Sequence, residues 1–270
     1  MTNCHQGRVQ RGLWLALLVG LFACTDSSSP NPSARYSDLS HAYDQDTIFW
    51  PTEEGFVLES EAAGITTKGY WYSANRFRSA EHGGTHLDAP IHFDEGGLSV
   101  DAIPIQKLIG TGVRINVREA CLEDRDHLIA IDDLQRWESK HGRIPVGALV
   151  LLDTGFAKYW PDRIAYMGTD ERGPDAVAKL HFPGLDPAAA QWLVEQREIH
   201  GVGLDTPSID RGQSVDFMSH RILARAGISI FENLADLSSL PAQGFEVIAL
   251  PMKIKHGSGA PLRIVARLPD

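Results

Sequence analysis

The chain has 270 residues and a formal net charge of −10, with 35 acidic against 25 basic side chains. This balance argues against nucleic acid as a partner and gives no electrostatic attraction to anionic lipid. A hydrophobic content of 43% allows a substantial core, and three cysteines are too few for a fold built on disulfides.

The N-terminal residues have the composition of a bacterial secretory leader. Arg8 and Arg11 supply its positive region, and residues 13–23 (LWLALLVGLFA) form an apolar run that is short for a membrane-spanning helix. The run ends in Leu-Phe-Ala-Cys, which resembles the lipobox of bacterial lipoproteins, and this resemblance implies that Cys24 is lipidated and becomes the mature N-terminus. We therefore expect a lipoprotein on the periplasmic face of a bacterial membrane, or a periplasmic protein if Cys24 is not lipidated.

Three segments follow from this assignment. Residues 1–23 are expected to be the signal peptide, and residues 24–37 a flexible tether rich in serine and proline. Residues 38–270 are expected to form a single domain, since no repeat or second linker interrupts them. Loss of Arg8 and Arg11 with the leader changes the net charge to −12, and Cys121 is then left without an intramolecular disulfide partner.

Predicted strands and helices occur in mixed order along the domain, and neither type dominates. Alternating or continuous apolar residues predict seven strands, near residues 70–77, 112–117, 148–153, 200–204, 228–231, 245–252 and 262–266. Three helices are predicted by their start and stop signals: one from Asp132 or Asp133 to about residue 141, one after the Asp186-Pro187 pair, and one from Asp216 to a stop at Gly227. The order indicates an α/β domain, but the pattern does not decide whether its sheet is mixed or antiparallel or, with equal weight, parallel.

Residues 81–95 (EHGGTHLDAPIHFDE) concentrate groups that bind metals. Gly83, Gly84 and Pro90 disfavour a helix here. In an extended segment every second residue faces the same side, so His82, His86, Asp88 and His92 would share one face. Two imidazoles and a carboxylate suit a catalytic divalent metal with open coordination positions. The alternative is that these histidines are ordinary loop or core residues. It would be the better explanation for any one histidine considered alone, but not for the four metal-binding side chains considered together.

The segment HGGTHLDAPIHF resembles the H-x-G-T-H-x-D-x-P-x-H motif of the metal-dependent cyclase family, which contains bacterial kynurenine formamidases and isatin hydrolases. The resemblance implies that His82, His86 and Asp88 are metal ligands and that His92 is the catalytic acid/base. Similarity continues in GLDTPSID and PMKIKHGSG, so that it spans nearly the whole domain and implies the mixed-sheet β/β/α fold of that family.

Two residues distant from the motif also match the family pattern. His220 and Glu232, in HRILARAGISIFENL, resemble the histidine and glutamate that bind a second metal in di-zinc members, where the motif aspartate bridges the two ions. Alternatively, His220 could be a solvated helix residue, and Glu232 could start a loop or a helix. Asp205 and Asp210 are expected to shape turns rather than to bind metal, and His256 to lie at the surface or beside the substrate rather than to be a ligand.

The function expected from these residues is hydrolysis of a carbon–nitrogen bond in a small aromatic amide or lactam, as in an isatin hydrolase. Mn²⁺ or Zn²⁺ would activate water and carbonyl, and His92 would pass a proton to the departing nitrogen. Trp50 and Phe93 are expected to contact an aromatic substrate, although Trp50 is equally compatible with a core position. The resemblance also implies a homodimer or larger assembly.

Two alternative functions stay open. One is an arylformamidase that hydrolyses N-formylkynurenine, and the other is a periplasmic lipoprotein that binds metal or ligand without turnover. A free histidine beside a metal favours catalysis over binding alone. The chain contains neither the G-x-S-x-G motif of serine hydrolases nor the H-E-x-x-H motif of zinc proteases.

Overall fold

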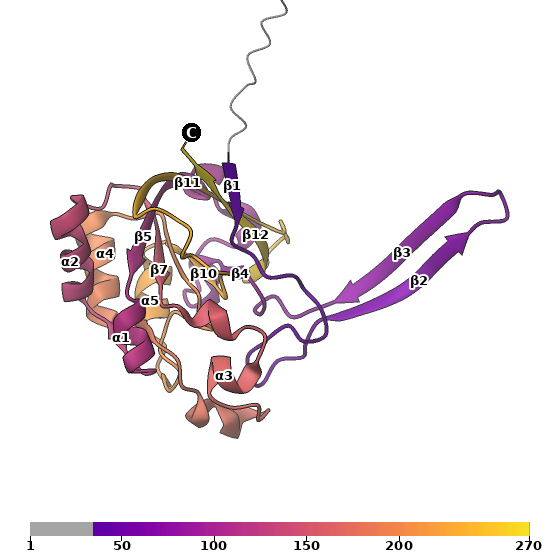
Figure 1. Ribbon diagram of the computed structural model, residues 1–270, viewed down its shortest axis with the longest axis horizontal. Helices are drawn as coiled ribbons and strands as arrows, with labels where there is room; N and C mark the ends of the chain where they lie inside the picture. Colours follow the sequence, from indigo (N-terminus) through magenta and orange to yellow (C-terminus); the bar gives the residue numbers. More distant parts are fainter. Residues whose placement is uncertain (1–34, 270) are drawn as a thin grey trace, which may run out of the picture. The chain divides into compact units, whose positions relative to one another are not determined.

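Eight strands form the central sheet of the computed structural model, which describes residues 35–269 (Figure 1). Their order is β1-β12-β11-β5-β7-β9-β10-β4, and β4 also pairs with β12, so the sheet closes on itself like a barrel. Strands β5, β7, β9 and β10 run parallel, whereas the other pairings are antiparallel. The strands are β1 (Arg35–Asp38), β4 (His86–Asp88), β5 (Ile109–Asn116), β7 (Leu149–Asp153), β9 (Gly201–Leu204), β10 (Ser229–Glu232), β11 (Gln243–Pro251) and β12 (Gly259–Leu268). The predicted α/β class with a mixed sheet is confirmed.

Strand β7 shows why the central strands are apolar on both sides. Leu149 and Leu151 pack into the inside of the closed sheet, against Phe231 and side chains of β11 and β12. Val150 and Leu152 point the other way, into a second core that includes side chains of α2 and α4. A strand covered on both faces is a continuous apolar run rather than an alternating one.

Five α-helices lie outside the closed sheet or beside its ends: α1 (Arg118–Glu123), α2 (Ile131–His141), α3 (Arg163–Met167), α4 (Pro187–Arg197) and α5 (Met218–Arg225). Helix α4 begins as predicted, since the Asp186 carboxylate accepts a 2.7 Å hydrogen bond from the amide of Ala188. The predicted start of α5 at Asp216 is wrong. Instead, the carboxylate of Asp210 accepts hydrogen bonds from the backbone amides of Ser219 and His220, at 3.0 and 3.1 Å. Asp210 is too far from the helix in sequence for a local capping pattern to reveal this contact. Gly227, at φ +69°, follows the end of α5 as predicted.

Short elements complete the described residues. The 3₁₀ turns are η1 (Pro90–His92), η2 (Val100–Ala102), η3 (Ile105–Lys107), η4 (Phe156–Tyr159) and η5 (Pro174–Lys179), and β6 (Leu128–Ile129) pairs with β8 (Gly184–Leu185). Strands β2 (Val57–Ile65) and β3 (Trp71–Arg78) form a separate antiparallel hairpin that extends away from the closed sheet (Figure 1). The strand predicted near residues 70–77 is β3, whereas β2 was not predicted.

The folded part begins earlier than expected. Strand β1 starts at Arg35 and pairs with β12, so the last residues of the segment 24–37 belong to the sheet and not to a tether. The signal peptide and Cys24 lie outside the described residues. Within residues 35–269, no helix has both the length and the apolar composition needed to cross a membrane.

Candidate active site

Strand β4 places two of the expected ligands between two neighbouring strands. It pairs with β10 on one side and β12 on the other, so His86 and Asp88 are held by backbone hydrogen bonds at both edges. Being two residues apart, their side chains point to the same side of the strand. Glu232 lies directly opposite His86 in the register with β10, which explains how a residue 146 positions later in the chain reaches the motif.

Tight turns, rather than one long strand, bring His82 and His92 to the same place. The expected common face of an extended segment is wrong, because β4 contains only residues 86–88 and His92 ends the η1 turn that starts at Pro90. Gly84 has φ +57°, and a Cβ atom there would lie 2.6 Å from the ring of Tyr43. Gly83 is packed equally tightly against Phe49, so both positions require glycine.

The first group of candidate ligands is His82, His86 and Asp88. The Nδ1 atom of His82 lies 2.6 Å from Asp88 Oδ1, and His86 Nε2 lies 3.1 Å from the same oxygen. These three ligand atoms all lie within 4.8 Å of one another, which is the spacing that a single metal ion needs. The carbonyl of Gly84 lies 3.0 Å from His86 Nδ1 and fixes the orientation of this imidazole.

A second group shares Asp88. His220 Nε2 lies 3.1 Å from Asp88 Oδ2 and 3.1 Å from Glu232 Oε1, and one ligand atom from each residue again falls within 4.8 Å. Helix α5 therefore brings His220 to the site, and it is not a solvated residue. The two oxygens of Asp88 therefore face different groups, and Asp88 is the residue that both groups would use to hold a metal.

Asp210 has a role that the sequence did not predict. Its Oδ2 lies 2.6 Å from His220 Nδ1, and its two oxygens also accept hydrogen bonds from backbone amides at the start of α5. A carboxylate on the far nitrogen fixes the tautomer and the direction of a ligand histidine. Asp210 is thus not merely a turn residue, as had been expected, although the prediction that it is not itself a ligand agrees with its position behind His220.

The electrostatics of the buried site favour a cation. Burial, followed by the charge of Asp88, raises the pKa of Glu232. Burial alone would also raise the pKa of Asp88, but the charges of His82 and His86 and the hydrogen bond with His220 hold it well below its usual range. The pKa of His220 is raised against the effect of burial by its hydrogen bonds to Asp210, Asp88 and Glu232. Two buried carboxylates that draw positive charge, together with three imidazoles, fit a divalent metal ion.

His92 lies beside this cluster without belonging to either ligand group. Its ring stacks on that of His82, with 3.8 Å between ring centroids, and lies 6.1 Å from the ring of His220. Burial lowers the pKa of His92 to about 4, and the charges of the neighbouring histidines act in the same direction. The imidazole is therefore neutral near pH 7 and able to accept a proton.

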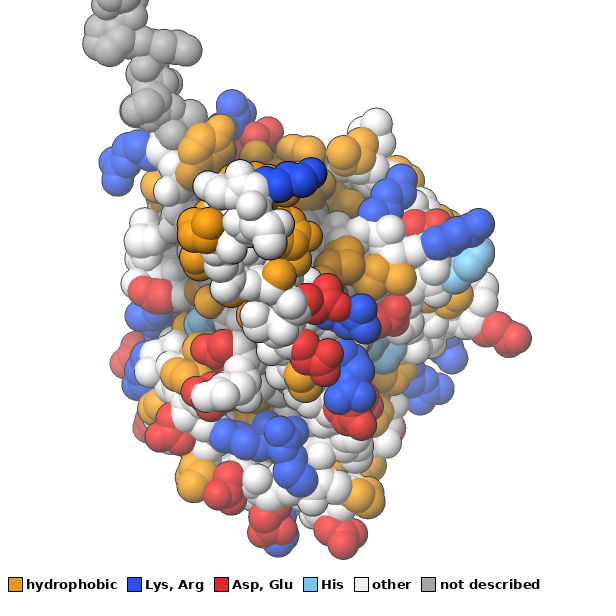
Figure 2. Space-filling view, turned by 90° about the vertical axis from the view of Figure 1, so that its right-hand side faces the viewer, with side chains coloured by type: hydrophobic (Ala, Val, Ile, Leu, Met, Phe, Trp, Pro, Cys, Tyr) orange, Lys and Arg blue, Asp and Glu red, His pale blue; other side chains and the backbone are white. Residues whose placement is uncertain are grey.

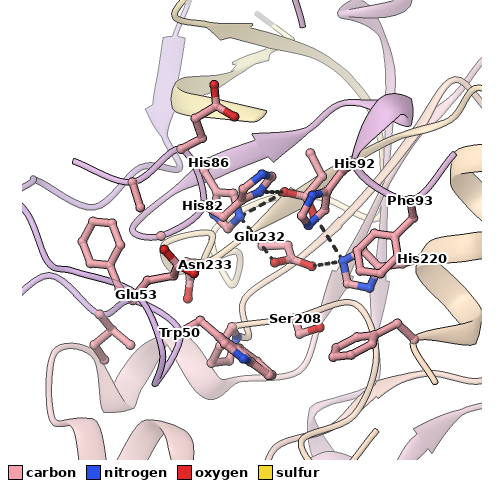
Figure 3. A pocket seen from close by; sticks show the side chains of 18 residues that line it. Trp50, Glu53, His82, His86, His92, Phe93, Ser208, His220, Glu232 and Asn233 are labelled. Atoms are coloured by element: carbon pink, nitrogen blue, oxygen red, sulfur yellow. Dashed lines mark hydrogen bonds and ion pairs between the residues drawn. The ribbon is translucent and has the colours of Figure 1, made fainter. Parts of the chain in front are cut away.

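A cavity of about 430 Å³ opens in front of the cluster. Figure 3 shows the imidazoles of His82, His86, His92 and His220 around Glu232, with Trp50 on another side of the cavity. The Trp50 ring contacts Phe217 with 6.3 Å between centroids, and Phe93 packs 5.5 Å from Phe217 and 4.6 Å from His220. Both predicted substrate-contact residues therefore line the cavity, although Trp50 also contacts the core residue Phe182.

Several lining residues were not predicted, because only the fold brings them to the cavity. They are Glu53, Glu81, Ser208, Phe217 and Asn233. Three of them lie in segments that had been singled out: Ser208 in GLDTPSID, Glu81 in residues 81–95 and Asn233 in HRILARAGISIFENL. Ser258, in the similar GSG turn, lies 2.9 Å from His82 Nε2, and its hydroxyl donates to Glu81 at 2.6 Å.

Trp71 and Tyr72 are 62% and 52% exposed on the hairpin and line no part of the cavity. Expectations for two other residues can be compared with the structure. His256 lies at the surface as expected. Asp205 is fully buried and accepts hydrogen bonds from Thr154 and from the amide of Ala157, so it supports the fold and lies outside both ligand groups.

The Cyclase family model, described as "Putative cyclase", matches residues 37–211, and the chain belongs to this family. An isatin hydrolase from Roseibium aggregatum is 34% identical over 209 residues, which cover 74% of this chain and 77% of that protein. A kynurenine formamidase from Bacillus thuringiensis is 27% identical over 246 residues, covering 87% of this chain and 98% of that protein. Among solved structures, isatin hydrolase A from Labrenzia aggregata bound to benzyl benzoate matches with a TM-score of 0.78 and 34% identity, covering 88% of this chain and 94% of that one. The family resemblance predicted from the motif is confirmed.

Proposed function

We propose that this protein is a metal-dependent hydrolase that cleaves the carbon–nitrogen bond of a small, neutral aromatic lactam or amide such as isatin. The proposal is carried by one juxtaposition: the unligated, neutral His92 faces the same cavity as two groups of metal-binding side chains that share Asp88. A protein that only bound metal or ligand would not need a proton carrier at this position. The similarity to isatin hydrolases and kynurenine formamidases supports the same reaction class.

Different residues of the site would have different roles in the reaction. His82, His86 and Asp88 would hold one Mn²⁺ or Zn²⁺ ion, and Asp88, His220 and Glu232 a second. The bound metal would supply Lewis-acid activation of water and of the substrate carbonyl. His92 accepts the proton of the attacking water and delivers it to the nitrogen that leaves the carbonyl carbon. Trp50, Phe93 and Phe217 contact the aromatic ring and exclude water around it.

The charge of the cavity supports a neutral substrate over an amino acid. No Lys or Arg is found among the described residues that line it, whereas Glu53 and Glu81 lie on its wall in addition to the acidic ligands. N-formylkynurenine is zwitterionic: its ammonium group can pair with Glu53 or Glu81, but its carboxylate would find no Lys or Arg side chain in the lining. Isatin carries no charge. This contrast favours the lactam over the formamide.

A substrate comparison tests the proposal. Protein loaded with Mn²⁺ or Zn²⁺ should hydrolyse isatin with kcat/KM at least tenfold above that for N-formylkynurenine. A higher kcat/KM for N-formylkynurenine would make the protein an arylformamidase, and no turnover of either compound would favour the non-catalytic binding protein.

We also propose that the mature protein is exported and anchored through a lipid on Cys24, and that it is a homo-oligomer. The first part rests on the leader and lipobox residues of the sequence, which precede the described residues. If Cys24 is the anchor, Cys24→Ser should release the protein from the membrane fraction of expressing bacteria. Retention of this variant on the membrane would contradict the anchor.

A further inference from the structure

Glu81 is a charged residue of the cavity wall to which the proposed reaction gives no role. Exposed acidic and basic side chains are interspersed over the face of the molecule shown in Figure 2, as on an ordinary solvated surface. Glu81 differs from them, because it is only partly exposed and its carboxylate is used inside the protein. Its Oε2 accepts hydrogen bonds from the hydroxyl of Ser258 at 2.6 Å and from the backbone amide of Ser258 at 2.9 Å.

The hydroxyl of Ser258 connects Glu81 to the candidate ligand His82. Its oxygen lies 2.9 Å from His82 Nε2. A serine hydroxyl has a single proton, and an ionised carboxylate can only accept, so this proton points to Glu81. The hydroxyl oxygen is then the acceptor in its contact with His82, which requires a proton on Nε2 of that imidazole.

A proton on Nε2 leaves Nδ1 of His82 as the nitrogen that can bind a metal. Nδ1 is also the atom that faces the first ligand group, 2.6 Å from Asp88 Oδ1. Since a neutral histidine binds a metal through its unprotonated nitrogen, the contact with Ser258 selects the tautomer that can act as a ligand. Glu81 and Ser258 thus have the same relation to His82 as Asp210 has to the other ligand histidine.

Two glycines allow the turn that carries Ser258 to approach both of its partners closely. A Cβ atom on Gly259 would lie 2.5 Å from Cε1 of His82, and one on Gly257 would lie 2.9 Å from Oε1 of Glu81. A side chain at position 259 would therefore displace the imidazole, and one at position 257 would displace the carboxylate. The Gly-Ser-Gly sequence is what brings the hydroxyl between the two groups.

The backbone of this turn is attached to the segment that carries the ligands. The carbonyl oxygen of Ser258 accepts a 2.9 Å hydrogen bond from the amide of Ala89. The next residue, Gly259, begins β12 and pairs with Asp88 of β4. Ser258 is therefore held against the same short strand as the first ligand group, so its hydroxyl has a defined position relative to those ligands.

The orientation of His82 also affects the proton carrier. The rings of His82 and His92 are stacked, with 3.8 Å between centroids and 19° between planes. Within residues 35–269 no hydrogen bond holds the side chain of His92, so its ring is oriented by packing against His82 and Phe93. A rotation of the His82 ring would therefore change the position from which His92 exchanges its proton.

We propose that Glu81 and Ser258 are a positioning pair: Ser258 holds His82 with Nδ1 toward the first ligand group, and Glu81 fixes the direction of the Ser258 hydroxyl. Through the stacked rings, the pair also orients His92. This inference rests on the proposed metal-dependent hydrolysis and deepens it, because it names the residues that align a ligand and the proton carrier together. Both residues act through His82, so they are positioning residues rather than catalytic ones.

Metal affinity tests the pair in Ser258→Ala. Without the hydroxyl either tautomer of His82 is available, and we expect the apparent dissociation constant for Zn²⁺, measured by competition with a chelator, to rise about 10–100-fold. Ser99→Ala is the matched control. It also removes a hydroxyl that donates to a carboxylate, that of Asp101 at 2.7 Å, and Asp101 accepts the amide of His256 next to the turn. Ser99 forms no hydrogen bond with a candidate ligand among the described residues, so this variant should keep the wild-type affinity.

Glu81→Ala makes an opposite tautomer available. The hydroxyl of Ser258 is then free to donate to Nε2 of His82, which favours a proton on Nδ1, the nitrogen needed for the metal. We expect this variant to weaken Zn²⁺ binding at least as much as Ser258→Ala. Glu81→Gln keeps an oxygen that can accept from Ser258 and should retain more of the affinity.

The ring protons of His82 distinguish positioning from general support of the fold. In Zn²⁺-loaded protein with ¹⁵N-labelled histidine, the wild type should show a slowly exchanging proton on Nε2 of His82, assigned by its absence in His82→Ala. Ser258→Ala should lose this signal, whereas Ser258→Thr, which keeps a hydroxyl, and Ser99→Ala should retain it. At saturating Zn²⁺, Ser258→Ala should lower kcat for isatin about 10-fold with an unchanged KM, because His92 is misaligned while the substrate contacts remain.

Wild-type Zn²⁺ affinity together with an unchanged His82 signal in Ser258→Ala would overturn the pair, and so would a proton on Nδ1 of His82 in the Zn²⁺-loaded wild type. Equal losses of affinity in Ser258→Ala and Ser99→Ala would show that the turn only supports the fold. These measurements need no substrate, so a pair that fails in a protein with metal-dependent turnover leaves the proposed function standing. A wild type that binds no Zn²⁺ would overturn both.

Discussion

At the scale of single residues, the site depends on what lies behind the ligands as much as on the ligands themselves. Asp210 holds His220 through Nδ1, and the carbonyl of Gly84 holds His86 in the same way. Among residues 35–269, His92 forms no hydrogen bond with a carboxylate and stacks on His82 instead, so it is free to exchange protons. Imidazoles of the same type thus acquire different roles from their hydrogen-bond partners.

Asp210→Asn tests the positioning of His220. Asparagine can still accept one of the two amides at the start of α5 through its single side-chain oxygen, but its neutral side chain no longer stabilises one tautomer of His220. We expect the apparent dissociation constant for Zn²⁺ at the second group to rise about 10–100-fold. Competition with a chelator measures it, and the exposed neighbour Asp216→Asn is the control that should behave like the wild type. Equal Zn²⁺ affinity of both variants would show that Asp210 only caps the helix.

At the scale of elements, a strand of three residues organises the site. Strand β4 is short, but it closes the sheet by pairing with both β10 and β12, so His86 and Asp88 are fixed from both sides. The turn before it can reach His82 only because Gly84 adopts a left-handed conformation in contact with Tyr43. Backbone geometry therefore sets the positions of the candidate ligands.

Gly84→Ala should disturb this turn more than an equivalent change elsewhere. The alanine would meet both an unfavourable φ of +57° and the ring of Tyr43, whereas Gly69, at φ +84° in the hairpin turn, has no atom within 4 Å of its Cβ position. We expect Gly84→Ala to lower the free energy of unfolding by at least about 1 kcal/mol more than Gly69→Ala, and to weaken metal binding. Urea denaturation of the two variants measures the difference. Equal losses of stability would mean that the contact with Tyr43 imposes no constraint.

At the scale of the whole molecule, the sequence predicted what is local and missed what the fold assembles. His82, His86, Asp88 and His92 lie within eleven residues and carry a recognisable motif, so their convergence could be expected. His220 and Glu232 were found only through the family resemblance, because nothing in their own surroundings marks them as ligands. Asp210, Phe217 and Glu53 became visible only once the sheet had closed and α5 had packed over the cavity.

The same distinction holds for the secondary structure. Apolar strands such as β7 were predicted because burial on both faces leaves a strong pattern. Strand β2 was missed because it contains Gly64 and a bulge between Ser60 and Ala62, and because its apolar residues face no core within the chain. A strand that packs against neither core shows only part of the pattern from which strands are recognised.

The most direct test of the account is a joint measurement of bound metal and of isatin hydrolysis in His92→Ala and His86→Ala, each beside the wild type. His92→Ala should keep the metal stoichiometry of the wild type and lose about 10²–10⁴-fold in kcat, whereas His86→Ala should lose both metal and activity. Full activity of the wild type in a strong chelator, with no metal bound, would contradict a metal-dependent hydrolase, and full activity of His92→Ala would contradict the proton carrier.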